Sequence, residues 1–543
     1  MSPARHAPDE QLDAATWCRH LVPDGSVYAF LADHRQQLFP AELFADLVSP
    51  RQRHPSVPAE VVGSVLVLQA LEGLSDRESV SALRRDIAWK VACGLRLDDE
   101  GFHPTVLVYW RNRLRASERP RRVFDAVHQV VEATGVLSGR RRRVLDSTIL
   151  DDAVATQDTV TQLVAAVRRV RRLLPQARAV KLGAHDYDRP GKPACDWDDP
   201  EARQALVTGL VNDALRVLAA VKDLELGGEQ AEAVALLALV AGQDVEPGER
   251  PGSWRIARKV AKDRIISTVD PEARHTRKTS AARRDGYKGH IAAEPETGLV
   301  TECALTAANL PDGPTGLGLL AGEPAGLEVL GDSHYGSGET RAALGAAGHT
   351  QTIKPIPLQS AVPGGFTVHD FRIDQQAGTV RCPAGAVAPI TSSGQASFAR
   401  HCQGCPLRAR CTTAKRGRVL RIHPYEQELR AARRRAMTRS FQCSYRRWRP
   451  MVERSLAWLV ADGCRRVCPT AASSATTCGG RCGSPRSTYA GCWCLALPAT
   501  TTPGSWPEPG GHRPGSSCSR VARSRPAARS SRQPRVLSRK LPS

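Results

Sequence analysis

Five short β-rich runs, separated by longer stretches with helical periodicity, constrain the fold of this chain more than any other feature. The first run is 141–152, RRRVLDSTILDD, and two more flank the Pro-Glu-Thr-Gly turn of the segment 286–309. A fourth covers 327–335 and a fifth covers 350–355. Strand-forming residues bounded by turn residues are typical of strands, and the central turn favours a hairpin. The pattern predicts an α/β fold that follows a mostly helical N-terminal region.

The helical stretches carry apolar residues spaced near 3.6 positions and are interrupted by Gly and Pro turns. Helices are expected at 60–71, 75–91, 120–134, 159–174, 205–224, 337–347 and 425–460. Ser337 is expected to cap the helix that it begins, with Glu339 in the first turn. At roughly 100–200 residues per domain, a chain of 543 residues should hold two to four units.

The charge balance points to a polyanionic partner. The chain has 76 Lys and Arg against 55 Asp and Glu, a net charge of +21, which favours nucleic acid before a membrane surface. The apolar runs are shorter than the roughly 18 residues of a membrane span, and the N-terminus does not resemble a signal peptide. We therefore expect a cytoplasmic protein without membrane association, whose 16 Cys residues stay reduced.

Three acidic residues stand out by position. Asp146 lies inside a β-rich run, Asp332 ends the apolar run 327–330, and Glu453 lies on the helix 425–460. Taken singly, a strand-end Asp is a common turn residue, and a Glu among Arg residues usually forms a surface ion pair. Two strand acids and one helix acid can also converge, and clustered carboxylates repel one another unless they hold a divalent cation.

At these residues the sequence resembles bacterial insertion-sequence transposases of the DDE class, over roughly residues 30–467. The resemblance is carried, in order, by VLDSTILDDAVATQDT around Asp146, GYKGHIAAEPETGLVTECALTAANLPD, VLGDSHYGSGETRAAL around Asp332 and YRRWRPMVERSLAWL around Glu453. It implies an RNase H-like fold, a five-stranded mixed sheet flanked by helices, with Asp146, Asp332 and Glu453 as the catalytic triad.

The resemblance also implies the chemistry. The three acids would bind two Mg²⁺ ions, with Mn²⁺ as a substitute, for hydrolysis of a phosphodiester at the element's end and attack of the freed 3′-hydroxyl on target DNA. The partners would be the terminal repeats and target DNA, bound by a homodimer. In relatives a Tyr and an Arg precede the Glu, as Tyr445 and Arg449 do here, whereas the Lys that some relatives carry seven residues later is Val460.

The domains expected from this resemblance are a helical N-terminal domain for DNA binding or dimerisation at 1–140 and a catalytic domain at 141–467, with a helical insertion at about 153–282. The basic stretch 108–122 is either a solvated helix face or a surface that contacts the DNA backbone. The residues predicted to bind DNA are Arg111, Arg113, Arg115, Tyr445, Arg446 and Arg449.

Two rival functions stay open at this point. The first is an inactive transposase remnant that only binds DNA. The second is an RNase H-like nuclease that cuts DNA without joining the 3′-hydroxyl to a target.

A Cys-rich segment lies at 382–418. Its cysteines, Cys382, Cys402, Cys405 and Cys411, are spaced C-x19-C-x2-C-x5-C. Four thiolates can close a tetrahedral zinc site, and C-x2-C is the usual turn that supplies two ligands. The alternative is four reduced thiols in a loop. The segment therefore gives a hypothesis of structural zinc.

The tail 468–543 differs from the rest of the chain. It holds 11 basic residues and one acid, Glu508, and its composition predicts disorder. Degenerate back-translation in an adjacent frame permits PYRGVERNDLWW and then ALRVAAINLRRLLV, the Tyr-Arg-Gly turn and Asn-Leu-Arg-Arg helix that the resemblance calls for. We therefore predict a frameshift near Val467, which would leave the six tail Cys without a metal role and the enzyme inactivated.

Overall fold

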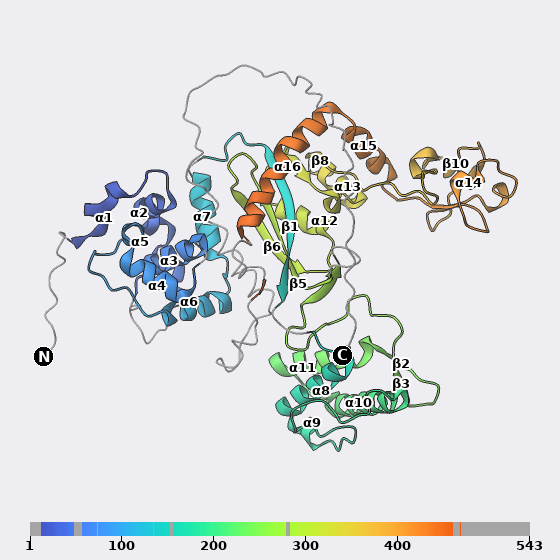
Figure 1. Cartoon of the computed structure of the whole chain (residues 1–543), viewed down its shortest axis with the longest axis horizontal. Helices are drawn as coiled ribbons and strands as arrows, with labels where there is room; N and C mark the ends of the chain where they lie inside the picture. The colour runs from blue at the N-terminus through green and yellow to red at the C-terminus, as the bar shows by residue number, and fades with distance from the viewer. Residues whose placement is uncertain are drawn as a thin grey trace, which may run out of the picture. The chain divides into compact units, whose positions relative to one another are not determined.

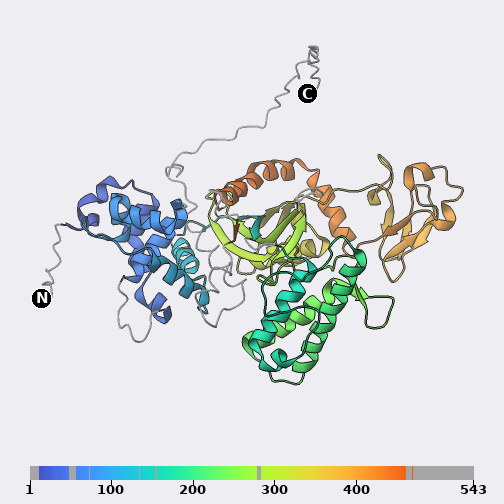
Figure 2. The same ribbon diagram turned by 60° about the horizontal axis from the view of Figure 1, so that its bottom comes forward.

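The computed structural model describes residues 12–47, 57–72, 74–133, 135–152, 156–277, 283–459 and 467–468. Figures 1 and 2 show the chain in two views. The tail predicted to be out of frame, from residue 469 onward, lies outside the described residues, as does Val460.

The N-terminal region is helical and has its own apolar core. Its elements are α1 (Ala14–Cys18), η2 (Arg19–Leu21), α2 (Val27–Leu38), η3 (Ala41–Leu47), α3 (Ala59–Glu72), α4 (Asp76–Arg85), α5 (Ile87–Cys93), α6 (Thr105–Ala116) and α7 (Arg122–Ala133). The expectation of one helix over 75–91 is wrong. Asp86 adopts an extended conformation, ends α4 and accepts hydrogen bonds from the backbone of Ala88 and Trp89 at the start of α5.

A mixed seven-stranded sheet follows. Its strands are β1 (Arg142–Asp152), β4 (Arg274–Arg277), β5 (Arg283–Ala293), β6 (Val300–Ala307), β7 (Glu328–Gly331), β8 (Thr350–Ile353) and β14 (Val467–Cys468). β1 is central: it pairs antiparallel with β5 and parallel with β7. β5 and β6 form the expected hairpin, and β8 pairs parallel with β7. The five β-rich runs therefore form five of the strands of one sheet.

The two faces of the sheet have separate apolar cores, because successive side chains along a strand point to opposite faces. Val144 and Leu330 pack with Val452 and Leu456 of α16 (Arg439–Leu459), which crosses β1 in Figure 1. On the other face Leu145 packs in a second cluster, to which three helical elements outside the sheet contribute residues. These are α12 (Asp312–Leu319), η4 (Ser333–Tyr335) and α13 (Gly338–Ala346). Ser337 caps α13, as predicted.

The segment between β1 and β5 is a helical bundle with a core of its own (Figure 2). It contains α8 (Thr159–Leu173), α9 (Pro175–Ala179), α10 (Pro200–Val221), α11 (Gly228–Gln243), β2 (Val245–Pro247) and β3 (Trp254–Ile256). Within the range expected for the insertion, β4 instead pairs with β5. Among the described helices α10 alone has the length and apolar composition to cross a membrane, and its buried residues pack against α8 and α11.

Short strands, which the sequence did not predict, form a small module between β8 and the C-terminal helices. Its elements are η5 (Val368–Asp370), β9 (Arg372–Asp374), β10 (Thr379–Arg381), β11 (Val387–Pro389), β12 (Gln395–Ser397), η6 (Ala399–His401), α14 (Arg408–Cys411) and β13 (Val419–Arg421). After it, the helical region expected at 425–460 is two helices, α15 (Glu426–Ala436) and α16.

Two glycines of α12 allow a matched test of the packing behind β1. A Cβ on Gly316 would lie 2.7 Å from Cδ1 of buried Tyr335 and 3.0 Å from Cδ1 of Leu145, whereas one on Gly318 meets nothing within 4 Å. We expect Gly316→Ala to lower the free energy of unfolding by about 1–3 kcal/mol. Gly318→Ala should raise it by up to about 1 kcal/mol. Denaturant unfolding of both variants checks this, and equal effects would contradict the packing described.

Candidate active site

The two strand acids lie at matching places on neighbouring parallel strands. Val144 of β1 pairs with Leu330 of β7, and Asp146 and Asp332 each follow two positions later. Both carboxyl groups are therefore expected on the face that α16 covers. Asp146 is nearly buried, with 12% of its side chain exposed, whereas Asp332 is 35% exposed.

Arg449 joins the strand acid to the helix acid. Its Nη2 lies 2.8 Å from Oδ1 of Asp146, and its Nη1 lies 3.8 Å from Oε1 of Glu453, one helical turn further along α16. The guanidinium group is nine-tenths buried, while Glu453 is 69% exposed. The two terminal nitrogens of the buried Arg449 guanidinium thus lie close to two different carboxylates, Asp146 and Glu453.

The electrostatics show that the three acids share one neighbourhood. Burial raises the pKa of Asp146, the Arg449 charge opposes the rise, and the carboxylate of Asp332 adds to it. Burial also raises the pKa of Tyr445, on the same helix, with contributions from all three carboxylates against Arg449. Asp332 accepts hydrogen bonds from the backbone N–H of His334, at 2.9 Å, and faces its ring Nδ1 at 3.2 Å.

The opposite face of β1 carries a buried polar network that the sequence analysis missed. The backbone N–H of Ser147 donates to Oδ1 of Asp146 at 2.9 Å, and its hydroxyl donates to Oδ2 of Asp312 at 2.9 Å. Lys288 of β5 donates to Oδ1 of the same buried Asp312 at 2.6 Å. Lys288 lies among other polar residues of β5, so its place in the sequence does not single out Asp312 as its partner.

Two further buried groups complete this network. His290 pairs across the strands with Ser147, and its Nδ1 lies 3.3 Å from the hydroxyl of Tyr335. Burial lowers the pKa of His290 to about 4, so the ring is neutral near pH 7. The network therefore supports the backbone next to Asp146 with hydrogen-bonded groups, most of them buried.

The predicted DNA-binding residues fall into two groups. On α16, Arg446 is exposed, and half-buried Tyr445 stacks on Phe441 with ring centroids 5.9 Å apart. On α6, Arg111 binds Gln69 and Asp76, and Arg113 donates to the carbonyl of Leu47 and covers the ring of Tyr109. The guanidinium groups of Arg111 and Arg113 thus contact their own helical region, and the side chain of Arg115 lies outside the described residues.

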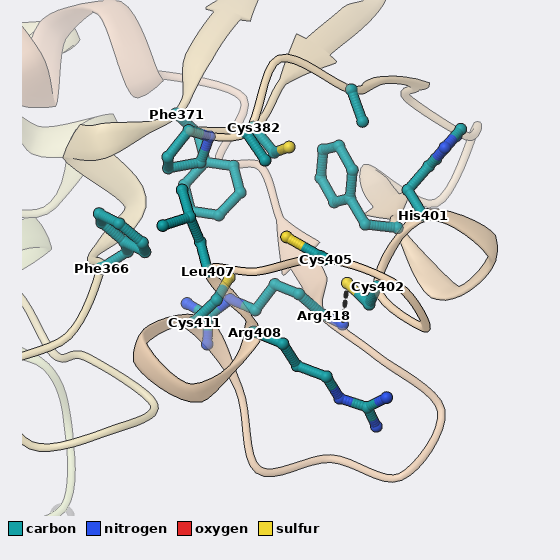
Figure 3. A pocket seen from close by; sticks show the side chains of 14 residues that line it. Phe366, Phe371, Cys382, His401, Cys402, Cys405, Leu407, Arg408, Cys411 and Arg418 are labelled. Atoms are coloured by element: carbon teal, nitrogen blue, oxygen red, sulfur yellow. Dashed lines mark hydrogen bonds between the residues drawn. The ribbon is translucent and has the colours of Figure 1, made fainter.

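No metal centre is closed in the parts of the chain that the structure describes. There, no group of three or more His, Cys, Asp or Glu side chains is arranged to hold a metal ion. Neither the three acids nor the cysteines therefore form a closed metal site. The four cysteines of the β9–β13 module nevertheless line one small cavity (Figure 3), and they are Cys382, Cys402, Cys405 and Cys411.

Two family models match this chain. A transposase domain (DUF772) matches residues 18–113, and a transposase DDE domain matches residues 382–471. The first covers the N-terminal region from the end of α1 into α6, and the second covers the small module from Cys382 onward together with α15 and α16. No curated protein and no solved structure matches the chain. Together the two matches support an insertion-sequence transposase of the DDE class.

The raised pKa of Asp146 predicts a pH dependence of stability. A carboxyl group whose pKa is higher in the folded chain stabilises the fold below its ordinary pKa and loses that contribution as the pH rises through the raised value. Wild-type protein should therefore lose stability relative to Asp146→Asn as the pH rises from about 4, the ordinary pKa of an Asp carboxyl, through the raised value. Thermal unfolding across this range checks it, and parallel profiles would contradict it.

Asp158 provides a control of opposite sign. Although burial opposes the change, hydrogen bonds from Lys192 and Thr161 lower the pKa of Asp158 at the start of α8. Wild-type protein should therefore gain stability relative to Asp158→Asn as the pH rises.

Proposed function

We propose that this chain, whose residues 18–113 and 382–471 match transposase domains, is an insertion-sequence transposase of the DDE class. It would cleave phosphodiesters at the ends of its element and transfer the freed strand into target DNA. The observation that carries the proposal is the contact of buried Arg449 with both Asp146 and Glu453, beside Asp332 at the matching position of the next strand. We propose Asp146, Asp332 and Glu453 as the catalytic residues.

The order of the strands supports an RNase H-like catalytic fold. Pairing gives the run β6–β5–β1–β7–β8, in which the first three strands are antiparallel neighbours and the last two are parallel to β1. Asp146 on the central strand and Asp332 after its parallel neighbour lie where ligands of such open sheets gather. The helix acid is then supplied by α16 across the same face.

The donor set fits divalent cations. Transposase DDE domains generally use divalent metal ions, and carboxylate oxygens are the ligands that Mg²⁺ and Mn²⁺ prefer. Burial raises the pKa of Asp146, and the like charge of Asp332 adds to the rise. A bound cation would relieve the repulsion between these two carboxylates. We propose that the three acids hold two Mg²⁺ ions, which when bound activate the attacking oxygen and stabilise the leaving oxygen.

Arg449 and its neighbours on α16 would position the DNA. Nη2 of Arg449 neutralises Asp146, whereas its Nε and Nη1, both buried, have no hydrogen-bond partner among the described residues. A guanidinium group with free N–H groups beside a cleavage site is suited to a phosphate oxygen. Exposed Arg446, three residues before Arg449 on the helix, would contact the DNA backbone next to Tyr445. The proposal for Arg111, Arg113 and Arg115 stays a prediction.

A second candidate, the inactive remnant, is favoured by the end of the DDE-domain match. That match stops at residue 471, just past Val467, where the sequence predicts the frameshift. In this case the chain would still bind DNA but would not cut it. We propose that the chain acts on DNA in the bacterial cytoplasm and that an active chain, which cuts two element ends as a pair, works as a homodimer on the DNA.

Cleavage of terminal-repeat DNA tests the triad. In the frame-repaired chain with Mg²⁺, we expect Asp146→Asn, Asp332→Asn and Glu453→Gln each to lower the cleavage rate by at least about 100-fold. Asp151→Asn is the matched control, because it lies on β1, faces away from Asp146 and pairs with Arg284. Equal cleavage by wild type and Asp146→Asn would refute the triad.

The same assay separates the rival functions. Nicking without joining of the 3′-hydroxyl to a target would identify a nuclease. Binding without nicking in the given chain, with both activities in the repaired chain, would identify a frameshifted remnant. High-accuracy reading of the coding DNA across codons 450–500 decides whether the frameshift is real.

Salt dependence tests the DNA contact of α16. If Arg446 neutralises one phosphate, Arg446→Gln should weaken binding uniformly across sequences and reduce the slope of log affinity against log salt by about 1. Arg172→Gln, an exposed Arg on α8, should leave the slope unchanged. Titration at several salt concentrations with Ca²⁺ in place of Mg²⁺ checks this, and an unchanged slope for Arg446→Gln would remove the contact.

A further inference from the structure

Four cysteines of the β9–β13 module line one small cavity. The cavity has a volume of about 30 Å³. The sulfur atoms of Cys382, Cys402, Cys405 and Cys411 surround the same space in Figure 3, whereas the ring of His401 points away from it. Cys402 and Cys411 are buried, and the other two are partly exposed. All four thiols are free.

Backbone turns hold these cysteines in place. Cys382 follows β10, where its N–H donates to the carbonyl of Ala386 at 2.8 Å and its own carbonyl accepts from Gly385 at 2.9 Å. Sγ of Cys402 accepts a hydrogen bond from the backbone N–H of Arg418 at 3.4 Å. Backbone N–H groups directed at sulfur stabilise a thiolate, which is the form that binds metal.

The backbone at Gly417 also approaches Cys402 closely and helps to hold this cysteine in place. Gly417 has φ +91°, and a Cβ there would lie 2.9 Å from Cβ and 3.3 Å from Sγ of Cys402. The loop that follows α14 therefore folds tightly over this sulfur. Such a turn brings the loop of Arg418 against the cysteine that begins the C-x2-C pair.

Four sulfur atoms around one small cavity become a stable arrangement of thiolates only if a cation neutralises them.

The module has little else to stabilise it. Its strands are each three residues long, and its largest buried side chains are Phe371 and Phe398, whose ring centroids lie 5.7 Å apart. A unit of this size usually needs a disulfide or a metal in addition to its core. A disulfide is disfavoured for a protein that works on DNA in the reducing cytoplasm.

We propose that Cys382, Cys402, Cys405 and Cys411 bind one structural Zn²⁺ ion, which crosslinks the β9–β13 module. Binding would draw the sulfur atoms inward from their present arrangement, which is not a closed metal site. The four thiols would release their protons as the Zn–S bonds form, and no oxidation or reduction is involved. The ion would be structural because four protein ligands leave no open coordination position.

Metal content of the full chain tests the proposal. Protein purified without chelator should hold one more zinc ion per chain than Cys405→Ser prepared in parallel. Cys195→Ser, a partly exposed Cys of the helical insertion, is the matched control and should keep the wild-type content. Comparison of variants, rather than a total count, separates this site from the tail cysteines. Equal zinc in wild type and Cys405→Ser would overturn the proposal.

Two further measurements keep the test decisive if Cys405→Ser fails to fold. Cys405→His should restore the zinc and the fold, because a Cys₃His set also binds zinc. Cobalt substituted into the wild-type chain should give the intense thiolate charge-transfer absorption of a tetrahedral four-sulfur site, and this absorption should be the same in Cys195→Ser. Absence of that absorption from wild-type protein would refute the site. None of these readouts depends on DNA cleavage, so failure of the transposase proposal would leave them unaffected.

Discussion

The ion pair between Arg449 and Asp146 is the interaction on which the candidate site depends. It joins the one long helix of this face to the central strand, and it places a cation where three carboxyl groups approach one another. Two charges buried together are stable only while each keeps its partner. The helix register of α16 is thereby fixed relative to β1, and this register determines where Glu453 lies. Val452 and Leu456 of α16 also hold the helix on the sheet, through apolar packing in the cluster that contains Val144 and Leu330.

The two faces of β1 carry different polar contacts. Asp146 belongs to the face under α16, where it forms an ion pair with Arg449 of that helix. Ser147, its neighbour, belongs to the opposite face, where Asp312 and Lys288 form a closed and buried ion pair. The backbone between the two residues links them, because the N–H of Ser147 donates to Asp146. The face of β1 that carries Asp146 is thus supported by an opposite face whose polar groups are hydrogen-bonded to one another.

The sequence was sufficient for features whose signals are local. Strand periodicity located β1, β5 and β6, and the cap signal located Ser337. The resemblance proposed Asp146, Asp332 and Glu453, which lie near one another around α16, and their catalytic role stays a prediction. Features that depend on distant partners were missed. Nothing in the sequence near Asp312 indicates that Lys288 pairs with it, and the short strands of the β9–β13 module carry too few residues for periodicity. Asp86 was missed because its capping role interrupts a pattern that is otherwise continuous.

The position of the helical bundle between β1 and β5 has a consequence for biosynthesis. Arg142 of β1 pairs with Glu328 of β7, so the central strand leaves the ribosome long before its parallel neighbour exists. At about 5–20 residues per second, the delay is on the order of 10–40 s. The bundle, which has its own core, can fold before β5 is made, while both edges of β1 are unpaired. The edge of β1 that pairs with β7 stays unpaired until β7 itself is made. Nascent chains of this protein are therefore expected to depend on chaperones that cover exposed strand edges, and to be prone to aggregation when translation stalls before β7.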